Sequence, residues 1–456
     1  MGIRSSFAAF LGRSAGWVAE TFFRRKAGHL PGAIALKADP NVLASLATQV
    51  DPVMVISGTN GKTTTNNLVA DCLATSGIPL VCNREGNNLQ GGVVAAILAR
   101  HDHSQATPEG SKLPHVCAFE CDELYTRFVL PRVKPRYFML LNLFRDQLDR
   151  FGDVERIQDT ISEALAKTPE TVFVYNGDDP LCAAIAQRVP NKSVAFGIKD
   201  NLGAEADEAG EGNFCQRCGS AMGYDFVHYG HLGAFRCPKC GFARPELAFA
   251  AEDVRRGPDG FEFTIDGRIV KTGQSGVYMV YNTLAVYAIC KLSGLVSFEN
   301  FQQCVLAYQP TNGRLQNFAL GNRRVMTNLA KNPVGFNQNV RIALQEEGKV
   351  LALFVNDEEG DGLDVSWYWD VDFERLAQIP GLKVFAGGAR ANDMQVRLKY
   401  AGINAQLVKT AQDVLDATAP EDGKVFIIAN YTALPIVRKE LEGIQAACAQ
   451  AAEGEE

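Results

Sequence analysis

Short apolar runs alternate with longer amphipathic segments along the first half of the chain. The runs are rich in β-branched and aromatic residues, which is typical of buried strands, and the segments between them have helical periodicity. Because strands that alternate with helices form βαβ units, the pattern predicts an α/β domain with a mostly parallel sheet. The candidate strands are 53–57, 116–120, 137–141 and 172–176, and the candidate helices include 64–76 and 158–167.

The same alternation returns after a turn-rich segment that contains Pro310, Asn312 and Gly313. We therefore predict a helical lead-in (1–50), a larger α/β domain (51–309), a smaller C-terminal α/β domain (310–445) and a frayed tail (446–456). Within the larger domain, 260–265 and 268–270 read as strands and 281–292 as a helix. The candidate strands of the smaller domain are 324–328, 350–356, 382–386, 405–407 and 424–430.

Composition narrows the class of protein. A chain of 456 residues with 46% hydrophobic content is too long for one ordinary core, so two or three domains are expected. A net charge of −7 argues against a general nucleic-acid binder. No apolar run reaches the ~20 residues that span a bilayer, and no signal-peptide pattern is present, so we expect a cytoplasmic protein. The basic stretch 22–26 offers peripheral contact with anionic lipid at the inner membrane face, although a solvated helix end is the favoured reading.

Residues 53–65, VMVISGTNGKTTT, join a predicted strand to a predicted helix through a glycine turn. Backbone N–H groups that converge at a helix N-terminus bind phosphate, so the segment predicts a nucleotide loop. Lys62 would reach the β- and γ-phosphates and the Thr63 hydroxyl would bind Mg²⁺. The general pattern, however, has a glycine where this chain has Ile56, and a tight turn with Lys62 on the surface is the alternative. The predicted loop is Gly58, Thr59, Asn60, Gly61, Lys62, Thr63 and Thr64.

Acidic residues follow two of the predicted strands. Glu120 and Asp122 stand at the end of 116–120, and Asn142 with the cluster 145–150 follows the next strand. Parallel sheets bind ligands at the carboxyl ends of their strands, and Mg²⁺ prefers oxygen ligands. These residues therefore predict a magnesium site, with solvated loops as the alternative.

Four cysteines have the spacing C-x2-C-x18-C-x2-C: Cys215, Cys218, Cys237 and Cys240. Two such thiolate pairs close a tetrahedral site that suits Zn²⁺, and four ligands leave no open position for catalysis. We therefore predict a structural zinc ribbon inserted at about 205–245; coincidence or two disulfides are the alternatives. His228 and His231 lie between the pairs but are not needed as ligands.

Several motifs together resemble those of the Mur ligases and folylpolyglutamate synthase. They are GTNGKTTT, the strand end at Glu120, LNLFRDQLDRFGD (141–153), NGDDP (176–180), Tyr281-Asn282 and Gly313-Arg314-Leu315. These families use a shortened phosphate loop, which accounts for Ile56. They activate a carboxylate with ATP as an acyl phosphate that an amine then attacks.

The resemblance implies site residues and also shows two departures. It implies that Lys62 and Thr63 bind the phosphates and Mg²⁺, that Glu120 is a Mg²⁺ ligand, and that Asn282 and Arg314 contact the nucleotide. Where Mur ligases have a metal-binding histidine in D-H-L-D, this chain has Gln147, which puts a second magnesium in doubt. The other departure is the cysteine ribbon, which ordinary Mur ligases lack.

The ribbon together with DGLDVSWYWD (361–370) resembles the MurT family, the synthetase subunits of lipid II isoglutaminyl synthases. The likeness covers roughly residues 40–440. It implies ATP-dependent amidation of the α-carboxyl of D-Glu in the lipid II stem peptide, which gives D-isoglutamine during peptidoglycan synthesis.

Ammonia for such a reaction usually comes from glutamine, whose hydrolysis needs a cysteine paired with histidine. Cys290 and Cys304 have helical contexts, and no histidine is an obvious partner. The resemblance therefore implies a separate GatD-type glutaminase, whose Cys–His pair is completed by an aspartate of the synthetase subunit. We expect this aspartate to be Asp364, with Asp361 as second choice; a loop merely rich in acids is the alternative. The neighbouring Trp367, Tyr368 and Trp369 are aromatic residues of the kind found at interfaces.

Two other functions stay open at this point. One is a stand-alone Mur-type or folylpolyglutamate-type amino-acid ligase, against which the ribbon and the segment 361–370 count. The other is a nucleotide-regulated zinc-ribbon binding module without catalysis, against which Lys62 and Glu120 count.

Overall fold

The computed structural model of the chain describes most of its residues and divides them into two compact units. The first unit holds the described residues of 1–144, 154–203 and 211–308, and the second holds those from 309 onward together with Arg145 and Asp146. The described ranges are 1–23, 28–99, 115–146, 154–203, 211–257, 260–274, 276–309, 315–345, 349–358 and 360–453.

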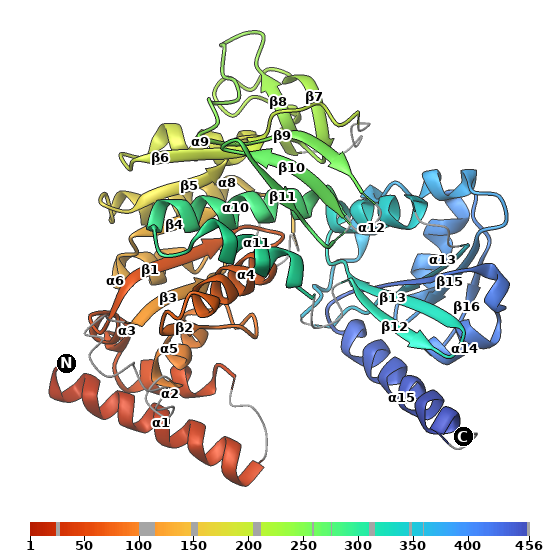
Figure 1. Cartoon of the computed structure of the whole chain (residues 1–456), viewed down its shortest axis with the longest axis horizontal. Helices are drawn as coiled ribbons and strands as arrows, with labels where there is room; N and C mark the ends of the chain where they lie inside the picture. The colour runs from red at the N-terminus through yellow and green to blue at the C-terminus, as the bar shows by residue number, and fades with distance from the viewer. Residues whose placement is uncertain are drawn as a thin grey trace. The chain divides into compact units, whose positions relative to one another are not determined.

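The first unit begins with three helices, α1 (Ile3–Phe23), α2 (Leu30–Ala38) and α3 (Val42–Ala47). Helix α1 packs against α2 (Figure 1), and the contact is close because glycine lies in it. A Cβ added at Gly12 would lie 2.7 Å from the backbone oxygen of Pro31. Within the described residues, no helix has the length and apolar character needed to cross a membrane.

A nine-stranded sheet forms the centre of the first unit, in the order β11-β10-β9-β6-β5-β4-β1-β3-β2. Within this sheet β9, β6, β5, β4, β1, β3 and β2 each pair in parallel with the next, and β10 and β11 add an antiparallel edge. The bounds are β1 (Val50–Ser57), β2 (Leu80–Cys82), β3 (His115–Glu120), β4 (Tyr137–Leu140), β5 (Val172–Asn176), β6 (Ser193–Ile198), β9 (Phe249–Arg256), β10 (Phe261–Ile265) and β11 (Arg268–Lys271).

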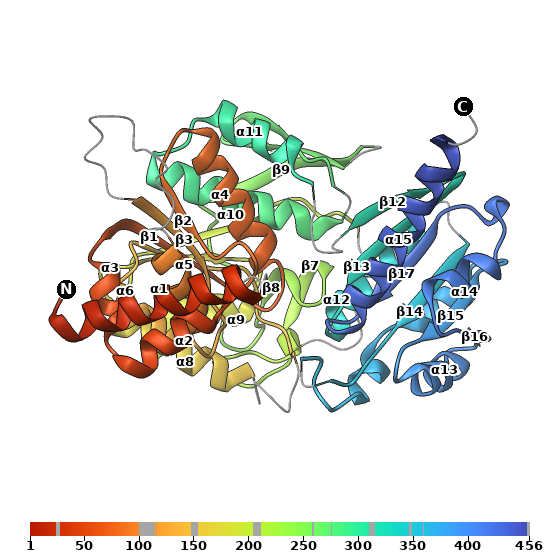
Figure 2. The same ribbon diagram turned by 90° about the horizontal axis from the view of Figure 1, so that it is seen from below.

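Helices cover both faces of this sheet. Helices α4 (Lys62–Thr75), α10 (Val277–Ser293) and α11 (Phe298–Ala307) pack together on one face, and Figure 2 shows α6 and α8 on the other. Their bounds, with those of the remaining helices, are α5 (Gln90–Ala99), α6 (Thr126–Val133), α8 (Val154–Ala166) and α9 (Pro180–Arg188). The mostly parallel α/β architecture predicted from the sequence is confirmed.

The cysteine-rich insertion lies between β6 and β9. It contains a short 3-10 helix, η1 (Glu211–Asn213), and the antiparallel hairpin of β7 (Gly223–Tyr229) and β8 (Leu232–Arg236). Two isolated bridges, Phe214 with Ala221 and Arg236 with Ala243, close the chain around each cysteine pair. The hairpin projects from one end of the sheet (Figure 1).

The second unit has a six-stranded sheet in the order β12-β13-β17-β14-β15-β16, in which only β12 runs antiparallel to its neighbour. Its core is a cluster of buried aliphatic and aromatic residues on β12, β13, β14, β15, β17, α14 and α15, together with Val408 directly after β16. The strands are β12 (Gln316–Leu320), β13 (Arg323–Leu329), β14 (Val350–Phe354), β15 (Lys383–Gly387), β16 (Ala405–Leu407) and β17 (Val425–Ala429). The helices are α12 (Pro333–Gln345), α13 (Ala391–Tyr400), α14 (Ala411–Asp416), α15 (Ala433–Glu453), η2 (Ser366–Asp370), η3 (Phe373–Gln378) and η4 (Pro420–Asp422).

The predicted frayed tail is wrong for residues 446–453, which continue α15. Buried Leu434, Val437 and Leu441 hold the helix on the core, and Ile444 extends the same face by one turn. The residues beyond are rich in alanine, which has the highest helix propensity and lets the helix run on.

Candidate nucleotide site and cysteine cluster

The predicted phosphate loop lies between the end of β1 and the start of α4. Its two glycines have positive φ angles, +134° at Gly58 and +88° at Gly61, which side chains other than hydrogen rarely allow. A Cβ on Gly61 would also lie 2.5 Å from Oδ1 of Asn282 on α10. Glycine is therefore required at position 61 for two reasons. Asn282 lies directly against the loop, and its contact with the nucleotide stays a prediction.

Residues that follow β4 fix the conformation of the loop. The backbone N–H of Thr59 donates to the Asn142 carbonyl (2.9 Å), and that of Asn60 donates to the Asn142 side-chain oxygen (2.9 Å). The Thr59 hydroxyl in turn accepts from the N–H of Phe144 (3.0 Å). The sequence suggested Asn142 only as part of a polar strand end. In the structure it holds the phosphate loop through these hydrogen bonds.

Lys62 is buried and turns back over the loop. Its ammonium group donates to the carbonyls of Gly58 and Thr59 and lies 3.2 Å from both carboxylate oxygens of Glu123. A buried ammonium group without a partner is costly. Glu123 therefore balances the positive charge of Lys62 here, a role that the phosphates would take over when a nucleotide binds. Sequence reasoning missed Glu123, whose only signal is its place three residues after Glu120.

Glu120 and Thr63 face the same point beside the loop. The Oε1 atom of Glu120 accepts from Asn88 (3.0 Å), whereas Oε2 is buried without a hydrogen-bond partner among the described residues. Asn83 fixes the Glu120 backbone through two hydrogen bonds of 2.8 Å. A Cβ on Gly86 would lie 3.4 Å from the Thr63 hydroxyl and 3.7 Å from Glu120 Oε2. A spare carboxylate oxygen and a hydroxyl around one point are a donor set that fits Mg²⁺.

Several predicted residues fall outside the described ranges. Arg314 is one, and Gln147, with the rest of the segment 147–153, is another, so their predicted roles stay predictions. Of the cluster after β4, the described Arg145 pairs with Asp370 and Asp146 pairs with Lys331.

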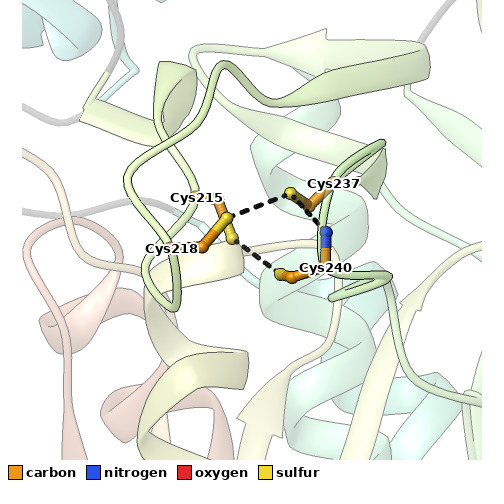
Figure 3. Close-up of side chains that lie close together, drawn as sticks. All are labelled: Cys215, Cys218, Cys237 and Cys240. Atoms are coloured by element: carbon orange, nitrogen blue, oxygen red, sulfur yellow. Dashed lines mark hydrogen bonds between the residues drawn. The ribbon is translucent and has the colours of Figure 1, made fainter.

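The four predicted cysteines come together within the insertion (Figure 3). Their sulfur atoms all lie within 4.8 Å of one another, with Cys215 to Cys240 at 3.5 Å and Cys218 to Cys237 at 3.6 Å. None of them forms a disulfide. A tetrahedral ion with metal–sulfur bonds of about 2.3 Å requires sulfur–sulfur distances of about 3.8 Å, so the cluster has the size of a Zn²⁺ site.

The electrostatics of the cluster also favour a cation. The Ser220 hydroxyl lowers the pKa of Cys218 to about 6, and the backbone N–H of Cys240 lowers the pKa of Cys237. Burial instead raises the pKa of Cys215 to about 11. When all four groups are ionised they repel one another at these distances, and a central cation would offset that repulsion.

Asp178, in the NGDDP motif, connects the end of the insertion to α10. Its carboxylate lies 3.2 Å from the Arg244 guanidinium and accepts hydrogen bonds from the Tyr281 hydroxyl and the Ile198 N–H, both 2.8 Å. Burial raises the pKa of Asp178 to about 6 in spite of these partners. Tyr281 precedes Asn282, so Asp178 helps to orient the helix that lies against the phosphate loop.

Asp179 connects the hairpin to the loop after β4. It caps α9 and accepts a hydrogen bond from the N–H of Leu143 (2.8 Å), and its other oxygen lies 3.3 Å from His231. The His231 ring packs against that of Phe144, with centroids 4.7 Å apart. His231 is therefore engaged with Asp179, in agreement with the expectation that the cluster does not need it as a ligand.

The two candidate aspartates of the second unit have different environments. Asp361 is buried and accepts hydrogen bonds from the N–H and hydroxyl of Thr432. Asp364 is exposed; it accepts from the N–H of Ser366 (2.8 Å), and the Ser366 hydroxyl lowers its pKa. Of the aromatic residues expected at an interface, Tyr368 is buried, which makes it part of the core instead.

Comparisons with known proteins agree on a family. Residues 56–229 match the Mur ligase middle domain and residues 329–434 match the MurT ligase C-terminal domain. The MurT subunit of the glutamine-hydrolysing lipid II isoglutaminyl synthase of Staphylococcus aureus (strain N315) is 34% identical, over 90% of this chain and 92% of that protein. The chain belongs to the MurT family. Its counterpart in Streptococcus pneumoniae (strain R6) is 31% identical over 97% of this chain and the whole of that protein.

Solved structures extend the likeness of this MurT-family chain to its fold. A pseudomurein peptide ligase type C from Methanothermus fervidus matches with a TM-score of 0.63 at 19% identity, over 88% of this chain and 80% of that one. MurF from Acinetobacter baumannii matches with a TM-score of 0.64 at 16% identity, over 91% and 80%. The chain therefore has the fold of Mur ligases, a fold that implies the use of ATP and Mg²⁺, and it is a ligase.

Proposed function

We propose that this chain is the synthetase subunit of a lipid II isoglutaminyl synthase. In this reaction, an oxygen of the D-Glu α-carboxylate attacks the γ-phosphorus of ATP, and ADP leaves. Ammonia then attacks the acyl carbon, phosphate leaves, and loss of a proton gives the amide of D-isoglutamine. The observation that carries the proposal is the convergence of Thr63 Oγ1 and the spare Glu120 oxygen beside the phosphate loop, in a chain of the MurT family.

The residues around the loop have distinct parts in the proposed reaction. When a nucleotide binds, its β- and γ-phosphates replace Glu123 as the partner of Lys62, which then neutralises their charge. Thr63 and Glu120 hold Mg²⁺, which when bound draws electron density from the γ-phosphate. Asn282 packs on Gly61 and contacts the nucleotide, and Arg314 would do so from the segment after residue 309. The backbone of Gly61 to Thr64, at the N-terminus of α4, would supply the N–H donors of the cradle.

We assign Zn²⁺ to the cysteine cluster, as one structural ion per chain. Sulfur atoms 3.5–3.6 Å apart, with no disulfide among them, support this assignment. The cluster lies in the insertion and its four ligands are all protein groups, so it has no open position for substrate.

We further propose a GatD-type glutaminase as the partner that supplies ammonia. The relatives in Staphylococcus aureus and Streptococcus pneumoniae are described as subunits of a glutamine-hydrolysing enzyme, which implies a second chain. Asp364 is the aspartate best placed to complete a site on that partner, because it is exposed and ionised whereas Asp361 is committed to Thr432. Two apolar residues of the same segment are also exposed, Leu363 (70% exposed) and Trp369 (52% exposed).

The test is incubation with ATP, lipid II and glutamine, with and without a candidate glutaminase, followed by mass measurement of the lipid product. Amidation lowers the mass by the difference between a hydroxyl and an amino group, and with the glutaminase absent it should require added ammonium. A stand-alone Mur-type or folylpolyglutamate-type ligase would instead raise the mass by a whole amino-acid residue. Any such increase, or no product under either nitrogen source, would contradict the proposal.

A further inference from the structure

Helix α1 has its small residues inside and its large apolar residues outside. Ala8, Ala9 and Gly12 are on the side that packs against α2 and α5, where Gly12 lies close to Leu98 and Pro31. The exposed side carries large apolar residues, which we call the α1 face: Ile3 (92% exposed), Phe7 (59%), Phe10 (62%), Trp17 (57%), Val18 (39%) and Phe22 (70%). A helix that only completed a core would have the opposite distribution.

The α1 face is a continuous stripe. At about 100° per residue its six side chains fall within an arc of about 140°, and they run along a helix about 30 Å long. The rings of Trp17 and Phe22 meet edge to face with centroids 5.8 Å apart. A contiguous apolar surface of this kind marks an interaction site, unlike single exposed apolar residues.

Six of the seven charged residues before position 39 are basic, although the whole chain has a net charge of −7. Glu20 is the single acidic residue before position 39. Two of the basic residues, Arg4 and Arg13, border the α1 face on opposite sides by the same helical count. The basic residues in this part of the sequence are Arg4, Arg13, Arg24, Arg25, Lys26 and Lys37.

We propose that the α1 face docks on an anionic lipid surface. Exposed Phe and Trp with flanking Arg are the composition of a helix that lies in the plane of a membrane interface, and α1 does not have the character of a spanning helix. This inference rests on the proposed function, because lipid II is a membrane-anchored substrate. The α1 face would hold the first unit where that substrate is found.

Charge decides between lipid and a second copy of the chain as the occupant of the α1 face. Two α1 faces that met would bring the same basic borders together, whereas anionic headgroups would neutralise them. The lipid surface is therefore the occupant that the residues favour, and self-association becomes an outcome of the test.

The test is flotation of the full chain with vesicles that contain no lipid II. One set is made of phosphatidylcholine alone and the other includes phosphatidylglycerol. We expect binding to the anionic vesicles that weakens as salt rises, and binding at least about tenfold weaker for the double variant Phe7→Gln/Phe10→Gln. The matched control is Ile269→Gln on β11, which also replaces an exposed apolar residue (59%) and should bind as the wild type does.

Amidation assays separate docking from catalysis. The double variant should keep its kcat/KM on a lipid II analogue with a shortened, water-soluble tail and lose activity on lipid II in anionic vesicles. Equal vesicle binding by wild type and double variant, or no binding by the wild type, would overturn the inference. A wild-type dimer in sedimentation that the double variant abolishes would assign the α1 face to a second copy instead. If no amidation occurs with any substrate, the proposed function fails. Vesicle flotation would still show whether the α1 face binds anionic lipid.

Discussion

Asp179 is the residue through which the ribbon hairpin, α9 and the loop after β4 are held together, and Asp179→Ala tests that connection. In the wild type its fully buried carboxylate accepts from the N–H groups of Leu181 (2.8 Å) and Leu143 (2.8 Å) and contacts His231 (3.3 Å). The substitution removes all of these acceptors at once.

The expected loss of stability follows from these contacts. Removal of a helix N-cap costs about 1 kcal/mol, and each buried donor left without an acceptor costs about 1–3 kcal/mol. With the N–H of Leu143 and the His231 ring both affected, we expect Asp179→Ala to lower the free energy of unfolding by about 3–7 kcal/mol. Asp179→Asn is the matched variant, because asparagine caps helices equally well but offers one acceptor oxygen; its loss should be about half.

Urea unfolding followed by circular dichroism measures both losses. The same variants should weaken binding of a non-hydrolysable ATP analogue, because Leu143 precedes Phe144, whose N–H holds Thr59 of the phosphate loop. A loss below about 1 kcal/mol for Asp179→Ala, or equal losses for the two variants, would refute the reasoning.

Four further predictions concern the phosphate loop, the cysteine cluster, Asp364 and Asp178. Lys62→Ala should abolish ATP-dependent amidation, whereas full turnover would remove the phosphate loop from the mechanism. Elemental analysis should find about one zinc per chain, and metal-free folded protein would contradict the assignment of the cluster. Asp364→Asn should end the use of glutamine but spare the use of free ammonium; loss of both would place it in the synthetase site. Folding raises the pKa of Asp178 from 3.8 to about 6. The protonated carboxyl therefore adds to the free energy of unfolding in full below pH 3.8, and this contribution is lost as the pH rises through 6. The unfolding free energy of the wild type, compared with that of Asp178→Asn, should therefore be more favourable at pH 5 than at pH 7.5 by about 1 kcal/mol. A difference that grows with pH would refute the assignment.

The sequence predicted most of the fold because the buried strands are locally recognisable. The apolar runs at β1, β3, β4, β5, β14, β15 and β17 lie within a few residues of their predicted bounds. It did not identify β6, β7, β8 or β12. It also missed β2, which has three residues, and β9, whose second half is polar, because both depend on pairing with neighbouring strands. Strand order is likewise set by contacts between distant segments, which periodicity does not record.

The candidate site divides in the same way. Lys62 and the four cysteines were found from the sequence because each belongs to a motif of fixed spacing. Glu123 and the Asp179–His231 pair were missed because these contacts join residues 61 and 52 positions apart. Local patterns identify candidate ligand-binding groups, whereas the groups that orient them come together only in the fold.

The neighbouring Asp178 and Asp179 explain how the ribbon relates to the nucleotide site. From the insertion, Arg244 reaches Asp178 and His231 reaches Asp179, while from the side of the phosphate loop Tyr281 and Leu143 bind the same two carboxylates. Each aspartate is thus shared between the two structures. The cysteine cluster fixes the chain on both sides of the hairpin, so a metal that closes it also restrains Arg244 and His231. The ribbon consequently supports the elements that shape the ATP site without contributing a ligand to it.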